Sequence, residues 1–172
     1  GPDTAGAVEL TGNLSSPDAS ADTLQIDADG AITDGNVTVS GAEGGTAGSA
    51  DTSELTGFTV SQSGTANVGN LEVDGGNISV TGTAISLTGG TYRTFTSGAI
   101  TFSGAVDLAS SGALTISTPG DTGDDITFSG TGSTIDDSGS DSDVVVDSDD
   151  TSGGNITFGG AIGGTNALSS LD

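Results

Sequence analysis

The feature that most constrains this chain is a tripeptide, Ile-Thr-Phe, that occurs three times in its second half. The copies begin at Ile100, Ile126 and Ile156, so they are 26 and 30 residues apart, and a pair of Gly or Ser residues follows each copy. A weaker copy, Ile-Ser-Val, begins 22 residues earlier, at Ile78. Repeats of about 20 to 50 residues are typical of folds in which one structural unit stacks on the next. We therefore expect a stack of similar layers rather than one globular core.

Alternating residues indicate that the repeated unit is built of β-strands. Apolar residues alternate with polar ones in short runs bounded by Gly, Ser, Asn and Asp, which is the pattern of half-buried strands. Because Gly is spread through the chain and no run has helical spacing, the sequence predicts almost no helix. The expected strands are residues 24–28, 37–40, 58–61, 71–73, 78–80, 85–87, 92–95, 100–102, 106–108, 114–116, 126–128, 144–146 and 156–158.

Three such strands fit between successive copies of the motif, for example residues 100–102, 106–108 and 114–116. Three strands per layer predict an all-β fold, a triangular parallel β-helix (a β-solenoid) in which each layer is one coil. About seven coils at ~4.8 Å each would give a rod of roughly 35 Å. In this register the Phe residues of the three motifs are expected to stack inside, beside a column of Ile, and the Thr between them to point outward.

The regularity of the repeats divides the chain into parts. Residues 1–2, Gly-Pro, resemble the remnant of a cleaved expression tag. Residues 3–69 are expected to form irregular coils, and residues 70–172 regular coils with an acidic insertion around residues 121–150. The sequence contains neither a signal peptide nor an apolar run of membrane-spanning length. Any export signal is therefore expected to lie outside this segment.

Charge excludes several classes of partner and of chemistry. The chain has 24 acidic residues against one basic residue, Arg93, and contains neither His nor Cys. Nucleic acids and anionic membrane surfaces bind clustered cations, so neither is an expected partner. This chain therefore lacks the His and Cys residues that the usual pairs of nucleophile and base require. Without Cys it also forms neither disulfides nor zinc–thiolate sites. We therefore expect that it is not an enzyme.

The Asp residues between positions 121 and 150 form the candidate functional site. Carboxylates about 5 Å apart repel one another unless they are protonated or bridged by a cation, and Ca²⁺ accepts several oxygen ligands in irregular geometry. The alternative is a solvated acidic loop, because neither an EF-hand loop nor the nonapeptide of calcium-loaded β-rolls is present. The predicted calcium ligands, placed at the same corner of successive coils, are Asp121, Asp124 and Asp125 in one coil and Asp147, Asp149 and Asp150 in the next.

Two stretches resemble a known class of protein. Residues 154–171, which begin Gly-Asn-Ile-Thr-Phe-Gly-Gly-Ala-Ile, and residues 98–108, Gly-Ala-Ile-Thr-Phe-Ser-Gly-Ala-Val-Asp-Leu, resemble the degenerate repeats of very large bacterial surface proteins. These are the filamentous-haemagglutinin-like and autotransporter-like β-strand repeat proteins, and the resemblance covers residues 70–172. It implies a right-handed parallel β-helix on an adhesin or stalk that is extracellular or attached to the cell surface, with no catalytic motif.

The sequence thus favours a structural or adhesive segment of a large secreted or cell-surface protein. Its expected partners are other coils or copies of the same protein and cell-surface glycans. One alternative is a Ca²⁺-dependent module that binds carbohydrate or cleaves polysaccharide, with Arg93 as the candidate base. A second is an ice-binding face, although Thr is also simply favoured in strands. The hydroxyls of that face would come from Ser79 and Thr81, Thr101 and Ser103, and Thr127 and Ser129.

Overall fold

The computed structural model describes residues 5–12, 22–42, 55–138, 142–148 and 154–172. These residues form an all-β fold of fourteen strands in one sheet. They include no helix, and so none that could cross a membrane. The strands are β1 (Val8–Leu10), β2 (Thr23–Asp27), β3 (Val37–Ala42), β4 (Gly57–Val73), β5 (Ile78–Leu87), β6 (Thr91–Thr94), β7 (Ile100–Leu108), β8 (Leu114–Thr118), β9 (Ile126–Ser129), β10 (Thr134–Asp137), β11 (Asp143–Ser148), β12 (Ile156–Phe158), β13 (Ala161–Ile162) and β14 (Ser170–Leu171).

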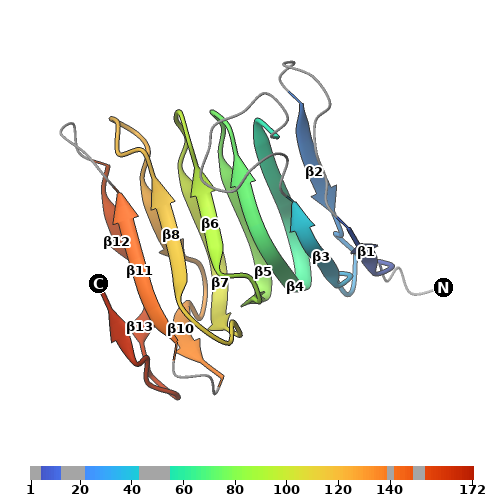
Figure 1. Cartoon of the computed structure of the whole chain (residues 1–172). Helices are drawn as coiled ribbons and strands as arrows, with labels where there is room; N and C mark the ends of the chain where they lie inside the picture. The colour runs from blue at the N-terminus through green and yellow to red at the C-terminus, as the bar shows by residue number, and fades with distance from the viewer. Residues whose placement is uncertain (1–4, 13–21, 43–54, 139–141, 149–153) are drawn as a thin grey trace.

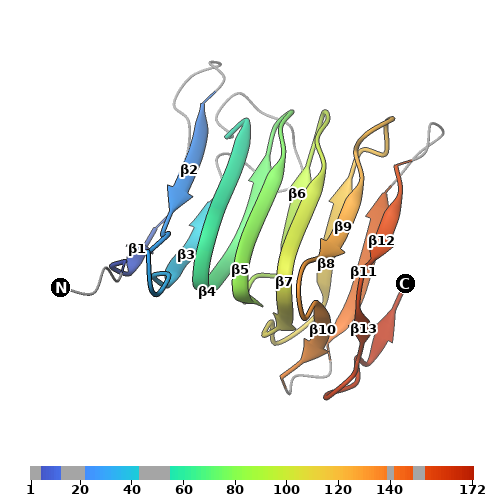
Figure 2. The ribbon, with the colours of Figure 1, turned by 180° about the vertical axis from the view of Figure 1, so that it is seen from behind.

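Parallel pairing joins strands that are one repeat apart, and the pairs form three ladders. The first ladder runs through β2, β4, β5, β7, β9 and β12. The second runs through β1, β3, β4, β5, β7, β10 and β13. The third runs through β4, β6, β8, β11 and β14. Because β4, β5 and β7 each take part in more than one ladder, the sheet curls, as Figures 1 and 2 show from opposite sides.

The repeated motif sets the register of the first ladder as predicted. Ile126 pairs with Ile100 and Ile156, and Phe128 pairs with Phe102 and Phe158. The ring centroids of Phe102 and Phe128 are 5.5 Å apart and those of Phe128 and Phe158 are 5.3 Å apart. Such aromatic pairs add about 0.5–1.5 kcal/mol to the effect of burial alone. Identical side chains thus stack on one another and hold the register.

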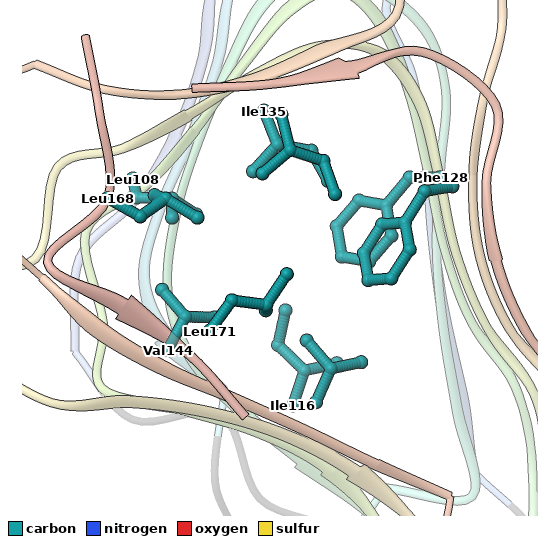
Figure 3. Close-up of a pocket in the computed structure, with 10 residues that line it drawn as sticks. Leu108, Ile116, Phe128, Ile135, Val144, Leu168 and Leu171 are labelled. Atoms are coloured by element: carbon teal, nitrogen blue, oxygen red, sulfur yellow. The ribbon is translucent and has the colours of Figure 1, made fainter.

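The three ladders line one apolar interior. Figure 3 shows Phe128 of the first ladder, Ile135 of the second and Ile116 of the third pointing toward a common centre. Burial alternates strictly along β7, where the Ile, Phe, Val and Leu side chains are inside and the residues between them are partly exposed. The predicted outward position of Thr101 is therefore confirmed, and the core is a narrow column along the stack.

Tyr92 brings a polar group into this interior. Its side chain is fully buried, and its ring edge meets Phe102 with centroids 5.9 Å apart. The hydroxyl donates to the Val68 carbonyl oxygen at 2.7 Å and accepts the Gly89 N–H at 3.0 Å. Burial raises the pKa of Tyr92 far above its usual value. The phenol therefore stays neutral and fully hydrogen-bonded, as a buried polar group must be.

The structure also contains strands that the alternation did not predict. Residues 58–61 and 71–73 were expected as separate strands, but they are the two ends of one long strand, β4, whose middle buries the smaller side chains of Ala66 and Val68. β1 was not predicted. The strand expected over residues 37–40 extends through residues 41–42 in β3, and residues 43–53 lie outside the described residues. Strands before residue 70 thus join the same ladders as the later ones.

Candidate functional site

Three of the six predicted calcium ligands lie in one turn. Asp121, Asp124 and Asp125 fall between β8 and β9, where the chain passes from the third ladder to the first. Asp147 lies on β11, where it is exposed and pairs with Ser117 of β8. The remaining two, Asp149 and Asp150, lie outside the described residues. Within the described part of the chain, no group of three acidic side chains is close enough to hold a metal ion.

The Asp124 carboxylate is buried, with 5% of its surface exposed, and it is already hydrogen-bonded. One oxygen, Oδ1, accepts the N–H of Gly98 at 2.6 Å, from the turn of the preceding repeat. The other, Oδ2, accepts the N–H of Asp121 at 3.2 Å, and the Asp124 carbonyl oxygen accepts the Thr118 hydroxyl at 2.7 Å. Asp124 therefore joins two successive turns through backbone amides.

Asp125 occupies a position that recurs once per repeat, directly before a strand of the first ladder. Its Oδ1 accepts both the backbone N–H of Asn155, at 2.7 Å, and the Asn155 side-chain amide, at 3.0 Å. Two repeats earlier, Asn77 Oδ1 accepts the N–H of Ala99 at 2.9 Å in the same way. Because Asn and Asp serve equally here, the position uses the side-chain oxygen rather than the negative charge.

These contacts give the turn a structural role that sequence reasoning missed. The recurrence of Asn77, Asp125 and Asn155 immediately before an Ile of the repeat was the available signal. Spacing alone placed carboxylates at one corner, but it did not reveal the amide donors that face them. Calcium binding by the six Asp residues stays a prediction.

Replacing Asp124 with alanine is expected to lower the free energy of unfolding by about 1–3 kcal/mol, because the Gly98 N–H loses its acceptor in a partly buried place. The matched change Asp125→Asn keeps an oxygen acceptor and is expected to cost less than about 0.5 kcal/mol. Urea unfolding followed by circular dichroism, in EGTA and again in millimolar Ca²⁺, measures both variants. A loss for Asp124→Ala that appeared only with Ca²⁺ would contradict the structural role and support the calcium hypothesis.

Asp136 on β10 holds the loop of the last repeat. Its Oδ1 accepts the backbone N–H groups of Thr165, at 2.8 Å, and Asn166, at 3.5 Å. The hydrogen bond from Thr165 is the main cause that lowers the pKa of Asp136 below its usual 3.8. A carboxyl group whose pKa is lowered by folding stabilises the fold above its unfolded pKa, and this contribution is lost as pH falls through the folded pKa.

We therefore expect Asp136 to titrate below 3.8 when its carboxyl carbon is followed by NMR in the folded chain. The Thr165 amide resonance should shift over the same pH range, because it reports the loss of the same hydrogen bond. Asp136→Asn keeps an acceptor and should remove that titration from the Thr165 amide. A pKa at or above the usual value would show that the loop does not depend on this carboxylate.

The outer face of the first ladder carries a regular row of hydroxyl groups. Thr101, Thr127 and Thr157 are in register, and Ser79 continues the row toward the N-terminus. In the neighbouring column, the hydroxyls of Ser103 and Ser129 are hydrogen-bonded to each other, with oxygens 3.2 Å apart. The structure thus places the hydroxyls of the predicted double row on one face of the stack.

Comparison of the chain with protein-family models, with curated proteins and with solved structures found no match. The resemblance to haemagglutinin-like and autotransporter-like repeats therefore stays a prediction from the residues that carry it.

Proposed function

We propose that this chain is a segment of a rod-shaped structural or adhesive protein that is secreted or held at a cell surface. We further propose that its curled sheet is one right-handed parallel β-helix with about three strands per coil. The observation that supports both is the continuity of one register along the chain. A single column of the first ladder contains, in order, Leu24, Phe58, Ile78, Ile100, Ile126 and Ile156.

A fold with such a column is built by adding equal layers, each of which contacts only its neighbours. Its length is then set by the number of repeats, which is what a stalk or spacer requires. The outer faces support this role, because their positions carry hydroxyl, amide and carboxylate groups, as at Thr38, Asn67, Ser86 and Asp107 of the second ladder. With a net charge of −23 the rod repels copies of itself and stays hydrated.

Labelling of intact cells tests the location. Antibodies raised against the 172-residue chain are expected to label unpermeabilised cells of the producing organism, or to detect the protein in its culture fluid. An antibody against a cytoplasmic protein serves as the control for intact cells. Labelling that requires permeabilisation would refute the surface location. A crystal structure in which the coils were left-handed, or in which the sheet did not close into coils, would refute the right-handed β-helix.

A further inference from the structure

One outer face of the stack differs in composition from the other two. Outward positions of the first ladder hold Gln, Asp and Thr or Ser, and those of the second hold Glu, Thr, Asn, Ser and Asp. The third ladder instead presents the single basic residue of the chain and several apolar side chains. The distinct residues of this face are Arg93, Phe95, Pro119, Val145 and Asp147.

Four of these residues, Arg93, Phe95, Pro119 and Asp147, line a shallow groove that crosses three strands. Arg93 of β6 pairs in register with Ser117 of β8, which pairs with Asp147 of β11. With neighbouring strands about 4.8 Å apart, Arg93 and Asp147 stand roughly 10 Å apart along the stack. Phe95 and Pro119 line the groove, whose volume is about 460 Å³. This volume lies within the range of small-molecule sites, roughly 300–1,000 Å³.

The Arg93 side chain stacks on an aromatic ring at one end of the groove. Its guanidinium lies over the ring of Phe95, 4.5 Å from the ring centroid. On β4, the strand next to β6, Glu72 pairs in register with Arg93. A guanidinium that stacks on an aromatic face presents its N–H groups sideways in a planar fork. The groove thus has a fixed donor at one end, the hydroxyls of Thr115 and Ser117 in the middle, and a carboxylate acceptor at the other end.

This arrangement selects a class of ligand. Neither kind of ion suits this groove. An anion would be repelled by Asp147 and by the net charge of −23. A cation would be attracted to the whole acidic surface and least strongly to the part beside Arg93. A neutral sugar offers hydroxyls that both accept from a guanidinium and donate to a carboxylate. The C–H face of its ring suits partly exposed apolar groups such as Phe95 in the groove. Val145, which is 37% exposed, pairs in register with the groove residue Thr115 and lies beside the groove.

We propose that the groove over β6, β8 and β11 binds a neutral linear saccharide that runs along the stack, with Arg93 and Asp147 as its main hydrogen-bonding residues. This groove would supply a ligand-binding site for the adhesive function proposed above. Its biological role rests on that proposed function, but its binding of saccharide does not. Since the groove is tested by binding to a folded chain, its failure would leave the rod and its surface location standing.

The test is an NMR titration of the isotopically labelled full chain with cellohexaose, maltohexaose and mannohexaose, followed by calorimetry on the sugar that binds best. At least one sugar is expected to shift amide resonances that cluster on β6, β8 and β11. Arg93→Met and Asp147→Asn are each expected to weaken that binding about tenfold or more, since each removes a charge-assisted hydrogen bond. Asp107→Asn, the same chemical change on the second ladder, should leave the affinity unchanged.

Two results would overturn the proposal. One is the absence of clustered shifts with all three sugars. The other is wild-type affinity in Arg93→Met, provided that circular dichroism shows the variant folded. A neutral extended peptide, for which a proline-rich decamer is a suitable probe, is titrated in parallel. Stronger shifts of the same resonances by that peptide would assign the groove to peptides and reject the saccharide.

Discussion

Replacing Phe102 with alanine is expected to lower the free energy of unfolding by about 3–5 kcal/mol. Phe102 has no exposed surface, and its ring contacts Tyr92 and Phe128 at centroid distances of 5.9 and 5.5 Å. The cavity left by the ring cannot close, because the backbone ladders keep neighbouring strands about 4.8 Å apart. Urea unfolding followed by circular dichroism measures the loss.

Thr101→Ala on the same strand is the matched control, since Thr101 points outward and is only partly buried. It is expected to cost less than about 1 kcal/mol, the range of strand propensities. A stacked fold can unfold in stages, so a nearest-neighbour model rather than a two-state fit applies if the transition broadens. Equal losses for the two variants would contradict the inward stacking of the Phe column.

Gly98→Ala is expected to lower the free energy of unfolding by about 3 kcal/mol or more, because two costs combine. Gly98 has a φ of 119°, which residues with a side chain adopt only with strain. A Cβ atom at this position would also collide with the carbonyl oxygen of Gly76, in the turn of the preceding repeat. Moving away from that oxygen would in turn stretch the 2.6 Å hydrogen bond from Gly98 to Asp124.

Two further glycine-to-alanine variants measure the backbone strain and the steric collision separately. Gly123 has a φ of 98° but open space around a Cβ, so Gly123→Ala should cost about 1–2 kcal/mol from strain alone. Gly112 has open space and no positive φ, so Gly112→Ala should be neutral or stabilise by up to about 1 kcal/mol. Urea unfolding of the three variants measures the series. If Gly98→Ala cost no more than Gly123→Ala, the turns would not be as closely stacked as described.

The Phe and Ile columns could be predicted because the motif repeats the same side chains, so that one alignment fixes the pairs of the first ladder from β5 to β12. The middle of β4 could not, because Ala66 and Val68 are too small to stand out among Gly, Ser and Thr. The role of Asp124 escaped prediction for a different reason: its partner is a backbone N–H of Gly98, and no sequence pattern marks a donor that becomes available only when two turns stack. Composition isolated Arg93 as the one cation, but its place over Phe95 and opposite Asp147 depends on the register of the third ladder.

Five side-chain oxygens in the turns share one direction along the chain, whereas Asp124, which accepts the Gly98 N–H of the preceding repeat, has the opposite one. Asn36, Asn70, Asn77, Asp125 and Asp136 each accept a backbone N–H from the repeat that follows. A repeat that has already formed therefore presents a vacant acceptor to the segment synthesised next, whereas an incoming earlier segment would find none of these. Because five of these six acceptors belong to the earlier repeat, we expect the turns to favour assembly from the N-terminus as the polypeptide emerges.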